Sequence, residues 1–277
     1  MNPKGKSTQL LHQFLYKAEV ESTQDLALET LLKWKSVETQ QKFQLVMADN
    51  QTRGRGTRSR EWQNSTNSND QLTFSIATEI NPQWRNHPIH GLTLVMGEAL
   101  WLALKKMGLK SESLFLKWPN DLMLQSLDPE QAWKKVGGIL CEQKKNCLVI
   151  GIGLNLLSSP SNLPHSDCLR NLLPANSKVD IEYRKTMALQ IFQEFEKSFA
   201  QWLKDPVLYI KDLAQRLEET LMKPLIKAQV ELKGQQIAAT IIGIDPNGFL
   251  LIQAQGSAAT ITIHSSDELR FYQFSPR

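Results

Sequence analysis

The sequence predicts a fold of the α+β or mixed α/β class, in which helices accompany a largely hairpin-connected sheet and a small all-β segment follows. Up to residue 222, apolar residues recur at helical spacing in some stretches and in short strand-like runs in others. After Lys223-Pro224 the chain changes to short strands separated by turn residues. A chain of 277 residues is long enough for one large core and a small second domain, so we expect domains at 1–222 and 223–277.

The first predicted helix covers residues 24–35. Its apolar residues fall at helical spacing, and Ser22 or Thr23 stands where an N-cap residue would lie. The mostly apolar run at 43–48 predicts a buried strand, whereas the alternation of apolar and polar residues at 72–76 predicts a half-buried one. A polar loop joins these two strands.

A long, mostly apolar stretch predicts a helix over 92–107 that ends at Gly108. Three further apolar runs, at 114–116, 138–141 and 148–153, predict strands. Beyond residue 183 four aromatic residues recur at spacings of three, four and three, which places them on one face of a helix: Phe192, Phe195, Phe199 and Trp202. We interpret this face as packing against the sheet rather than as a cofactor contact.

Five short strands are expected in the C-terminal segment, at 226–232, 237–244, 249–254, 258–263 and 269–274. Turn residues such as glycine, proline and asparagine separate them at regular intervals. This arrangement predicts a small all-β barrel of about 50 residues, joined to the rest of the chain by a short linker.

Composition argues against several classes of protein. The chain has 32 basic and 28 acidic residues and a net charge of +4, which is too mild an excess for a nucleic-acid-binding protein. The three cysteines, Cys141, Cys147 and Cys168, have no CxxC spacing, so neither a disulfide framework nor a zinc site is indicated. The sequence has no recognisable signal peptide and no run of about 20 apolar residues. We therefore expect a soluble cytoplasmic protein with neither DNA nor a membrane as partner.

The most distinctive loop runs from Gln51 to Trp62. It holds four arginines in eight positions together with two glycines: Arg53, Gly54, Arg55, Gly56, Arg58 and Arg60. Guanidinium groups bind phosphate and carboxylate oxygens in charge-assisted pairs, and glycines let the backbone approach a ligand. The loop therefore predicts a clamp for phosphate or carboxylate, with Trp62 placed to stack on a base. A solvated loop is the alternative, because the GxxxxGK[ST] pattern of a P-loop is absent.

A second cluster, Lys117-Trp118-Pro119-Asn120-Asp121, follows directly after a predicted strand. A lysine at the end of a strand can reach a phosphate, and Asn120 and Asp121 carry the oxygen ligands that Mg²⁺ prefers. A simple turn is the alternative. Two glycine-containing segments, 135–140 and 151–155, complete the set. Close packing or a strand bulge is the alternative explanation for their glycines.

In order and approximate spacing, these four segments and the preceding Glu21-Ser22-Thr23-Gln24 resemble the pattern of the biotin–protein ligase family, over roughly residues 10–275. The resemblance implies an α+β fold with a class II synthetase-like core, in which a mixed, largely antiparallel sheet is flanked by helices. It also implies a C-terminal Src-homology-3-like barrel. It also implies an enzyme that uses ATP and Mg²⁺ to convert biotin to biotinyl-5'-AMP. The same enzyme would then transfer the biotinyl group to a lysine of a biotin carboxyl carrier protein.

The resemblance implies three groups of site residues. The catalytic group consists of cations that neutralise developing negative charge: Arg55, Lys117 and Lys135. The binding group consists of residues that contact biotin or ATP: Ser22, Thr23, Gln24, Gln51, Gly54, Arg55, Gly56, Thr57, Arg58, Arg60, Trp62, Asn120, Lys135, Gly138, Gly151, Gly153 and Asn155. The magnesium group consists of Asn120 and Asp121.

The implied roles divide the ligand into a ring end and a nucleotide end. At the ring end, Ser22, Thr23 and Gln51 would hydrogen-bond the fused rings of biotin. At the nucleotide end, Trp62 and Asn155 would contact adenine. The catalytic cations would lie between the two ends, around the carboxylate and the phosphates.

Two motifs depart from the family pattern. The Ser-Thr-Asn motif reads Ser22-Thr23-Gln24 here, and Thr57 and Ser59 stand where the bifunctional ligase–repressor has an arginine and a glycine. Because one charge fewer would lie near the intermediate, we predict weaker retention of the adenylate than with arginine at position 57.

Three other functions stay open. A ligase or transferase for lipoate or another acyl group would share the fold. A biotin-responsive transcriptional regulator would carry an N-terminal helix-turn-helix domain of about 60 residues, and Ser22 comes too early in the chain for one. A non-catalytic binder would not need Arg55, Lys117 and Lys135 together. Both a monomer and a homodimer are compatible with the resemblance.

Overall fold

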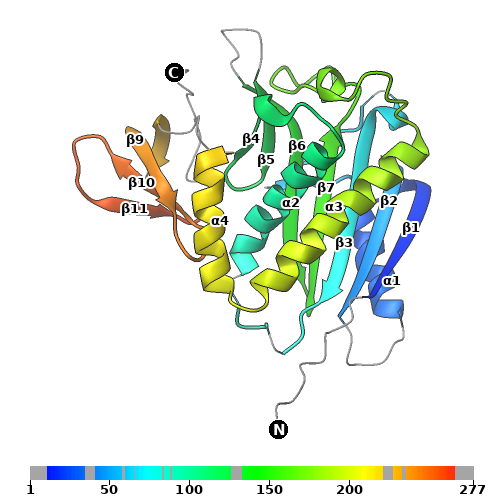
Figure 1. Ribbon diagram of the computed structural model, residues 1–277, viewed down its shortest axis with the longest axis horizontal. Helices are drawn as coiled ribbons and strands as arrows, with labels where there is room; N and C mark the ends of the chain where they lie inside the picture. Colours follow the sequence, from blue (N-terminus) through cyan, green and yellow to red (C-terminus); the bar gives the residue numbers. More distant parts are fainter. Residues whose placement is uncertain are drawn as a thin grey trace.

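The core of the protein is a seven-stranded mixed sheet. The computed structural model describes residues 11–34, 41–57, 60–65, 67–82, 84–87, 89–125, 133–220, 227–232 and 235–265. The sheet has the strand order β1-β2-β3-β7-β6-β5-β4 (Figure 1). Its strands are β1 (Leu11–Val20), β2 (Lys42–Gln51), β3 (Gln71–Glu79), β4 (Leu114–Lys117), β5 (Asp121–Gln125), β6 (Trp133–Lys144) and β7 (Cys147–Asn155). β1 pairs with β2 in parallel, and the other neighbours are antiparallel. The α+β class predicted from the sequence is confirmed.

Helices cover both faces of this sheet. They are α1 (Thr23–Lys33), α2 (Leu92–Lys106), α3 (Ile181–Trp202) and α4 (Pro206–Thr220). α2 and α3 cross one face, and α1 lies against the other, where its Ala27 and Leu31 pack on Val46 and Val149 (Figure 1). Alternate residues of a strand point to opposite faces, so β2, β3 and β7 each contribute residues to two apolar clusters. These three strands are almost wholly buried.

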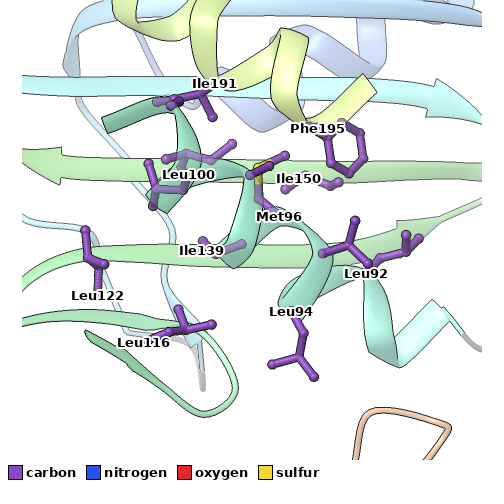
Figure 2. Close-up of a cluster of buried hydrophobic side chains, with 14 of the residues drawn as sticks. Leu92, Leu94, Met96, Leu100, Leu116, Leu122, Ile139, Ile150, Ile191 and Phe195 are labelled. Carbon is purple, nitrogen blue, oxygen red and sulfur yellow. The ribbon is translucent and has the colours of Figure 1, made fainter. Parts of the chain in front are cut away.

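The main core lies between the sheet and the α2–α3 pair. Figure 2 shows Leu92, Met96 and Leu100 of α2 lying over Ile139 and Ile150 of β6 and β7, all of them buried. This continuous apolar contact stabilises the fold by roughly 25 cal/mol per Å² of apolar surface buried. The sheet is therefore a rigid support for the side chains that its strands present.

The aromatic face predicted on the third helix packs as expected. Phe199 of α3 meets Phe43 edge-on, with ring centroids 5.7 Å apart, and Trp84 in the same manner at 5.5 Å. Edge-to-face pairs of this kind add to the stability that burial alone provides. The face is therefore structural, as interpreted from the sequence.

Three elements were not predicted: β1, β5 and α4. β1 lies at the edge of the sheet and has no regular alternation of buried and exposed residues, so it carries no period-2 signal. β5 begins at Asp121, inside the cluster for which a simple turn was the alternative interpretation. The turn at 118–120 does exist, and it joins β4 to β5 in a hairpin. α4 follows α3 after a break of only three residues, so its apolar positions merge with those of the preceding helix.

The C-terminal segment forms a separate four-stranded antiparallel sheet. Its strands are β8 (Lys227–Leu232), β9 (Gln235–Ile244), β10 (Leu250–Ala254) and β11 (Thr260–Ile263), in the order β11-β10-β9-β8. They correspond to four of the five predicted strands. The fifth, at 269–274, and the boundary at 222/223 lie outside the described residues, so closure of this sheet into a barrel stays a prediction.

The C-terminal sheet is attached to the core by specific contacts. The indole Nε1 of Trp118 donates a hydrogen bond of 2.9 Å to the carbonyl of Gly248. Gly248 has φ 91° and lies so close to Gly91 that a Cβ atom there would stand 2.8 Å from the Cα of Gly91. Only glycine satisfies both the positive φ and the close approach. Over the described ranges, no helix is both long and apolar enough to cross a membrane.

Candidate active site

A cavity opens where β2 and β3 part. The β2–β3 ladder ends at the pair Ala48–Thr73, and beyond it Gln51 pairs with Val20 of β1 while Gln71 pairs with Asn155 of β7. Together with the open space at its mouth, the cavity between them has a volume of about 460 Å³. Its walls come from α1, β2, β3, β6, β7 and the arginine-rich loop. The site therefore lies at a split in the sheet, where backbone and side chains of several elements face one space.

One end of this cavity is a buried set of hydrogen-bonding groups. The backbone N–H and the hydroxyl of Thr23 donate to Oε1 of Gln51 at 2.8 and 2.9 Å. The same hydroxyl lies 2.7 Å from Oγ of Ser75. All three residues are buried, so this end of the cavity is a preorganised polar surface with little access to water.

Ser22 and Gln24 flank this polar end in different ways. Ser22 occupies the N-cap position of α1 as predicted, but its hydroxyl makes no capping hydrogen bond. Oγ of Ser22 is buried and has no hydrogen-bond partner among the described residues. Gln24 reaches across to β6, where Nε2 donates to the carbonyl of Leu140 at 3.0 Å, and its side chain lies against Gly151. The longer side chain at position 24 thus forms part of the cavity wall.

The arginine-rich loop lines the cavity, and its two ends pair through backbone hydrogen bonds. Trp62 N–H donates to the carbonyl of Gly54 at 3.0 Å, and Gly56 N–H donates to the carbonyl of Arg60 at 2.8 Å. The Trp62 ring lies flat against Gly153, where a Cβ atom would stand 2.6 Å from it. The glycine of β7 is therefore required by the close approach of this ring, which also lies near Gly138 of β6, where an added Cβ atom would stand 3.7 Å from it.

Arg55 does not point freely into the cavity. Its Nη2 lies 3.1 Å from Oδ1 of Asp25 on α1 and 3.2 Å from Oε2 of Glu142 on β6. Lys144 also approaches Asp25, at 3.1 Å. The resemblance implied that Arg55 faces a ligand, whereas here its charge is balanced by two carboxylates. Neither acidic residue was identified from the sequence, because each belongs to a different element from the loop.

A second, larger cavity adjoins the first and, together with the open space at its mouth, has a volume of about 1450 Å³. The two share Gly56, Thr57, Trp62 and Lys135, so they form neighbouring parts of one site. Lys117, at the end of β4, lines the second cavity. The three predicted cations therefore surround one connected space, with Lys135 at its centre.

Lys135 and Asp121 form the shortest ion pair of this space. Nζ of Lys135 lies 2.6 Å from Oδ1 of Asp121 across the β5–β6 pair. Asn120 is buried and donates through Nδ2 to the carbonyl of Ile139 at 3.0 Å, so its amide ties β5 to β6. Asn155 donates to the carbonyl of Asp167 at 3.0 Å, and its Oδ1 is buried without a hydrogen-bond partner in the described part of the chain.

The magnesium ligands expected from the sequence fit only weakly. Asp121 is engaged with Lys135, and the Nδ2 of Asn120 is used structurally. In the described ranges no group of three or more histidine, cysteine, aspartate or glutamate side chains is arranged to hold a metal ion. A divalent cation would therefore need most of its oxygen ligands from a bound phosphate, which is a common arrangement for Mg²⁺.

The remaining predicted residues divide by location. Arg60 lines the second cavity, and Gly54 packs against Trp62 within the loop, where a Cβ atom would meet the carbonyl of Trp62 at 2.8 Å. Arg58 lies outside the described residues. Sequence reasoning missed Thr73 and Ser75, which line the first cavity. The alternation of apolar and polar residues in β3 was the signal that could have identified them, because it places the polar residues on the face opposite the apolar ones.

Comparisons with known proteins agree on one family. The model of the biotin/lipoate A/B protein ligase family matches residues 17–155. Biotin–protein ligase 1, chloroplastic, from Arabidopsis thaliana is 26% identical over 214 residues, which are 75% of this chain and 54% of that protein. A biotin–[acetyl-CoA-carboxylase] ligase from Mycobacterium tuberculosis is 25% identical, over 82% of this chain and 79% of its own length. This chain thus spans about half the length of the Arabidopsis relative.

Solved structures agree on the fold. The biotin protein ligase from Aquifex aeolicus, in complex with biotin and ATP, superimposes with a TM-score of 0.70 and 24% identity, covering 95% of this chain and 99% of that one. The biotin protein ligase from Leishmania major, in complex with biotin, has a TM-score of 0.56 and 20% identity, covering 91% of this chain and 98% of that one.

Proposed function

The chain belongs to the biotin/lipoate A/B protein ligase family, and from that premise we propose that it is a biotin–protein ligase. In this proposal it activates biotin with ATP and transfers the biotinyl group to a lysine of a biotin carboxyl carrier protein. One observation carries the proposal: Arg55, Lys117 and Lys135 surround one connected space that ends in a buried polar pocket. The cations match the negative charges of a carboxylate and a triphosphate, and the buried polar pocket matches an uncharged polar ring.

The buried polar end suits the ureido ring of biotin. That ring offers one carbonyl acceptor and two N–H donors. Thr23, Gln51 and Ser75 present hydroxyl and amide groups that can both donate and accept. Ile139 and Ile152 supply apolar contacts beside them. A site of this kind rejects ligands that lack the matching polar atoms, because its buried groups would then lose their partners.

The nucleotide would occupy the second cavity. The Trp62 ring offers a flat face for adenine. The Oδ1 of Asn155, which has no hydrogen-bond partner within the described ranges, can accept a hydrogen bond from the exocyclic amine. Lys117 and Arg60 lie along the same cavity, where their charges would attract the phosphates.

In the first step a carboxylate oxygen of biotin attacks the α-phosphorus of ATP. A carbon-bound oxygen becomes bonded to phosphorus, the bond to the β-phosphate oxygen breaks, and diphosphate leaves. Negative charge increases on the transferred phosphate and the leaving group, so fixed cations lower the barrier. Lys135 and Lys117 are placed to do this, and Mg²⁺ held mainly by the phosphates, with Asp121 beside it, would neutralise further charge.

In the second step the acceptor lysine attacks the carbonyl of the mixed anhydride. The new C–N bond forms as the C–O bond to AMP breaks, and the attacking amine gives up a proton. No nucleophile of this chain is needed for either step. Cys141 is unsuited to act as one, because burial raises the pKa of its thiol to about 12.

The proposal also covers the organisation of the chain. Residues 1–222 would form the catalytic domain, and residues 223–277 would close into a small barrel around the four described strands. The protein would act in the cytoplasm, where its carrier protein, biotin and ATP are available.

Mass spectrometry of an acceptor protein tests this function. The protein is incubated with ATP, Mg²⁺, biotin and a purified biotin carboxyl carrier domain, with lipoate in place of biotin as the control. We expect the carrier to gain one biotinyl group on its acceptor lysine, only when ATP is present, and to gain nothing from lipoate. A carrier that stays unmodified with biotin would contradict the proposal, and modification by lipoate would reassign the substrate.

A further inference from the structure

A buried arginine outside the cavity contacts both stems of the 52–67 loop. This loop contains the arginine-rich segment, and its stems are the residues that flank it on the β2 side and on the β3 side. Arg184 lies on α3, and only 1% of its side chain is exposed. Its Nη1 lies 2.9 Å from Oδ1 of Asp49, near the end of β2. Its Nη2 donates a 2.7 Å hydrogen bond to Oδ1 of Asn69, just before β3 begins. The two nitrogens of one guanidinium thus hold the two points at which the loop leaves and rejoins the sheet.

Sheet pairing does not set the distance between these stems. The β2–β3 ladder stops at the pair Ala48–Thr73, before either stem is reached. Beyond that pair, Gln51 follows β1 and Gln71 follows β7, so the two stems diverge. Arg184 bridges this split from α3.

Polar side chains carry the bridge onward to the ligand-binding residues. Gln71 donates through Nε2 to Oδ1 of Asn64 at 3.0 Å. Asn64 donates through Nδ2 to the carbonyl of Gln51 at 2.6 Å and to Oδ1 of Asn50 at 2.7 Å. Asn64 is two residues from Trp62, and Gln51 is the residue that receives the Thr23 hydrogen bonds. A change in the spacing of the stems would therefore be passed to both ends of the site.

The environment of Asp49 explains why a guanidinium is needed. Tyr16 of β1 donates its hydroxyl to Oδ2 of Asp49, and this hydrogen bond, together with burial, raises the pKa of Tyr16. Asp49 is thus held by Tyr16 on one oxygen and Arg184 on the other. An ammonium group could balance the charge of Asp49, but it lacks the planar fork that reaches Asp49 and Asn69 at a fixed separation.

We propose that Arg184 is a positioning residue for ligand binding: by bridging Asp49 and Asn69 it fixes the stems of the 52–67 loop, and with them Gln51 and Trp62. It does not touch the ligand, and it acts through the hydrogen bonds of Asn64 and Gln71. The expected effect on biotin binding rests on the proposed function, whereas the expected effect on the order of the loop does not.

The test compares Arg184→Lys with Arg216→Lys. Arg216 of α4 is a matched control, because it also makes a forked pair with a carboxylate, Glu98, at 2.8 and 3.3 Å, but neither residue lines the two cavities. Amide hydrogen exchange is measured across residues 60–71 without ligands. We expect exchange there to be at least about tenfold faster in Arg184→Lys, because one charge-assisted hydrogen bond is lost, and unchanged in Arg216→Lys.

Steady-state kinetics supply a second readout. In Arg184→Lys the KM for biotin should rise about tenfold while kcat changes by less than about twofold, because the lost hydrogen bond orders the binding residues and not the reacting atoms. Arg216→Lys should leave both constants unchanged. Loop exchange and KM equal to the wild-type values in a folded Arg184→Lys protein would overturn the proposal.

Asn69→Ala is the second variant, for the case in which Arg184→Lys does not fold. Asn69 is exposed, and its truncation removes one arm of the bridge but leaves the ion pair with Asp49. It should accelerate loop exchange in the same region, and an unchanged rate would count against the bridge. If the wild type proves inactive toward biotin, the proposed function fails, and the exchange comparison still decides the role of Arg184.

Discussion

The two halves of the site are built in opposite ways. The sheet half, made by Thr23, Gln51, Ser75 and the glycines of β6 and β7, is buried and internally hydrogen-bonded. In the loop half, from 52 to 62, charged side chains form ion pairs with partly exposed partners. Arg55, for example, pairs with Asp25, and the side chain of Asp25 is 56% exposed. One half is fixed by burial and the other by interactions that water and salt weaken.

This difference separates recognition from activation. Buried hydrogen bonds are costly to leave unmade, so the sheet half can discriminate between ligands. Exposed ion pairs are worth about 0–1 kcal/mol, so the loop half can exchange them for a stronger charge on a ligand. Changes in the sheet half should therefore cause large losses, and changes in the loop half should cause small effects of either sign.

The largest effect is expected for Lys135→Met. Lys135 belongs to β6 and lines both cavities, so its loss removes a fixed cation from the reacting phosphate. We expect kcat for biotin-dependent ATP–diphosphate exchange to fall about 10²–10³-fold, as for other fixed donors in active sites. Lys134→Met is the matched control, because neighbouring residues of a strand face opposite sides. Equal losses in the two variants would remove Lys135 from the centre of the site.

A smaller loss is expected for Gly153→Ala, which links the two halves. The added Cβ would stand 2.6 Å from the Trp62 ring and would push the loop away from the sheet. Overpacking costs about 1–3 kcal/mol, so binding of ATP should weaken about 10- to 100-fold by calorimetry. Gly151→Ala meets only the flexible Gln24 side chain, at 3.0 Å, and should weaken binding less. The reverse order would show that the Trp62 contact is not needed for binding.

An effect of opposite sign is expected for Asp25→Asn. Removal of one of the two carboxylates beside Arg55 frees its guanidinium for an anionic ligand. Affinity for the adenylate should rise about two- to fivefold, and the gain should shrink at high salt. Glu29→Gln, which breaks the Glu29–Lys33 pair on the same helix, serves as the control. Weaker binding in Asp25→Asn would mean that Asp25 orients Arg55 rather than competing for it.

The smallest effect is expected for Thr57→Arg. Thr57 lines both cavities, so an arginine there would add one charge near the intermediate. Release of biotinyl-5'-AMP should slow about two- to fivefold, the size of one exposed ion pair. Release rates are measured by trapping free adenylate after a single turnover. Identical rates in the two proteins would exclude position 57 as a determinant of retention.

Much of the fold and part of the site could be predicted from the sequence, because local patterns carry them. The helices at 24–35 and 92–107 and the strands at 43–48 and 148–153 follow from apolar periodicity. Among the cavity residues, Lys135 belongs to the compact motif at 135–140, which overlaps the predicted strand at 138–141. Such features depend on neighbours in the chain, which a sequence displays directly.

The pairings inside the site could not be predicted, because topology creates them. Arg55 meets Glu142, which is 87 residues away, only because the loop folds over β6. Lys135 meets Asp121 through a ladder whose register shifts between Leu122 and Met123, and no local pattern fixes that shift. The bridge from Arg184 likewise joins residues that are 115 positions apart.

A crystal structure with biotinyl-5'-AMP bound tests the central claim most directly. The fused rings should lie among Thr23, Gln51 and Ser75, and the guanidinium of Arg55 should have left Asp25 for the acyl phosphate. A bound ligand that leaves Arg55 on Asp25 and Glu142, or that places its rings away from the Thr23 pocket, would contradict the account.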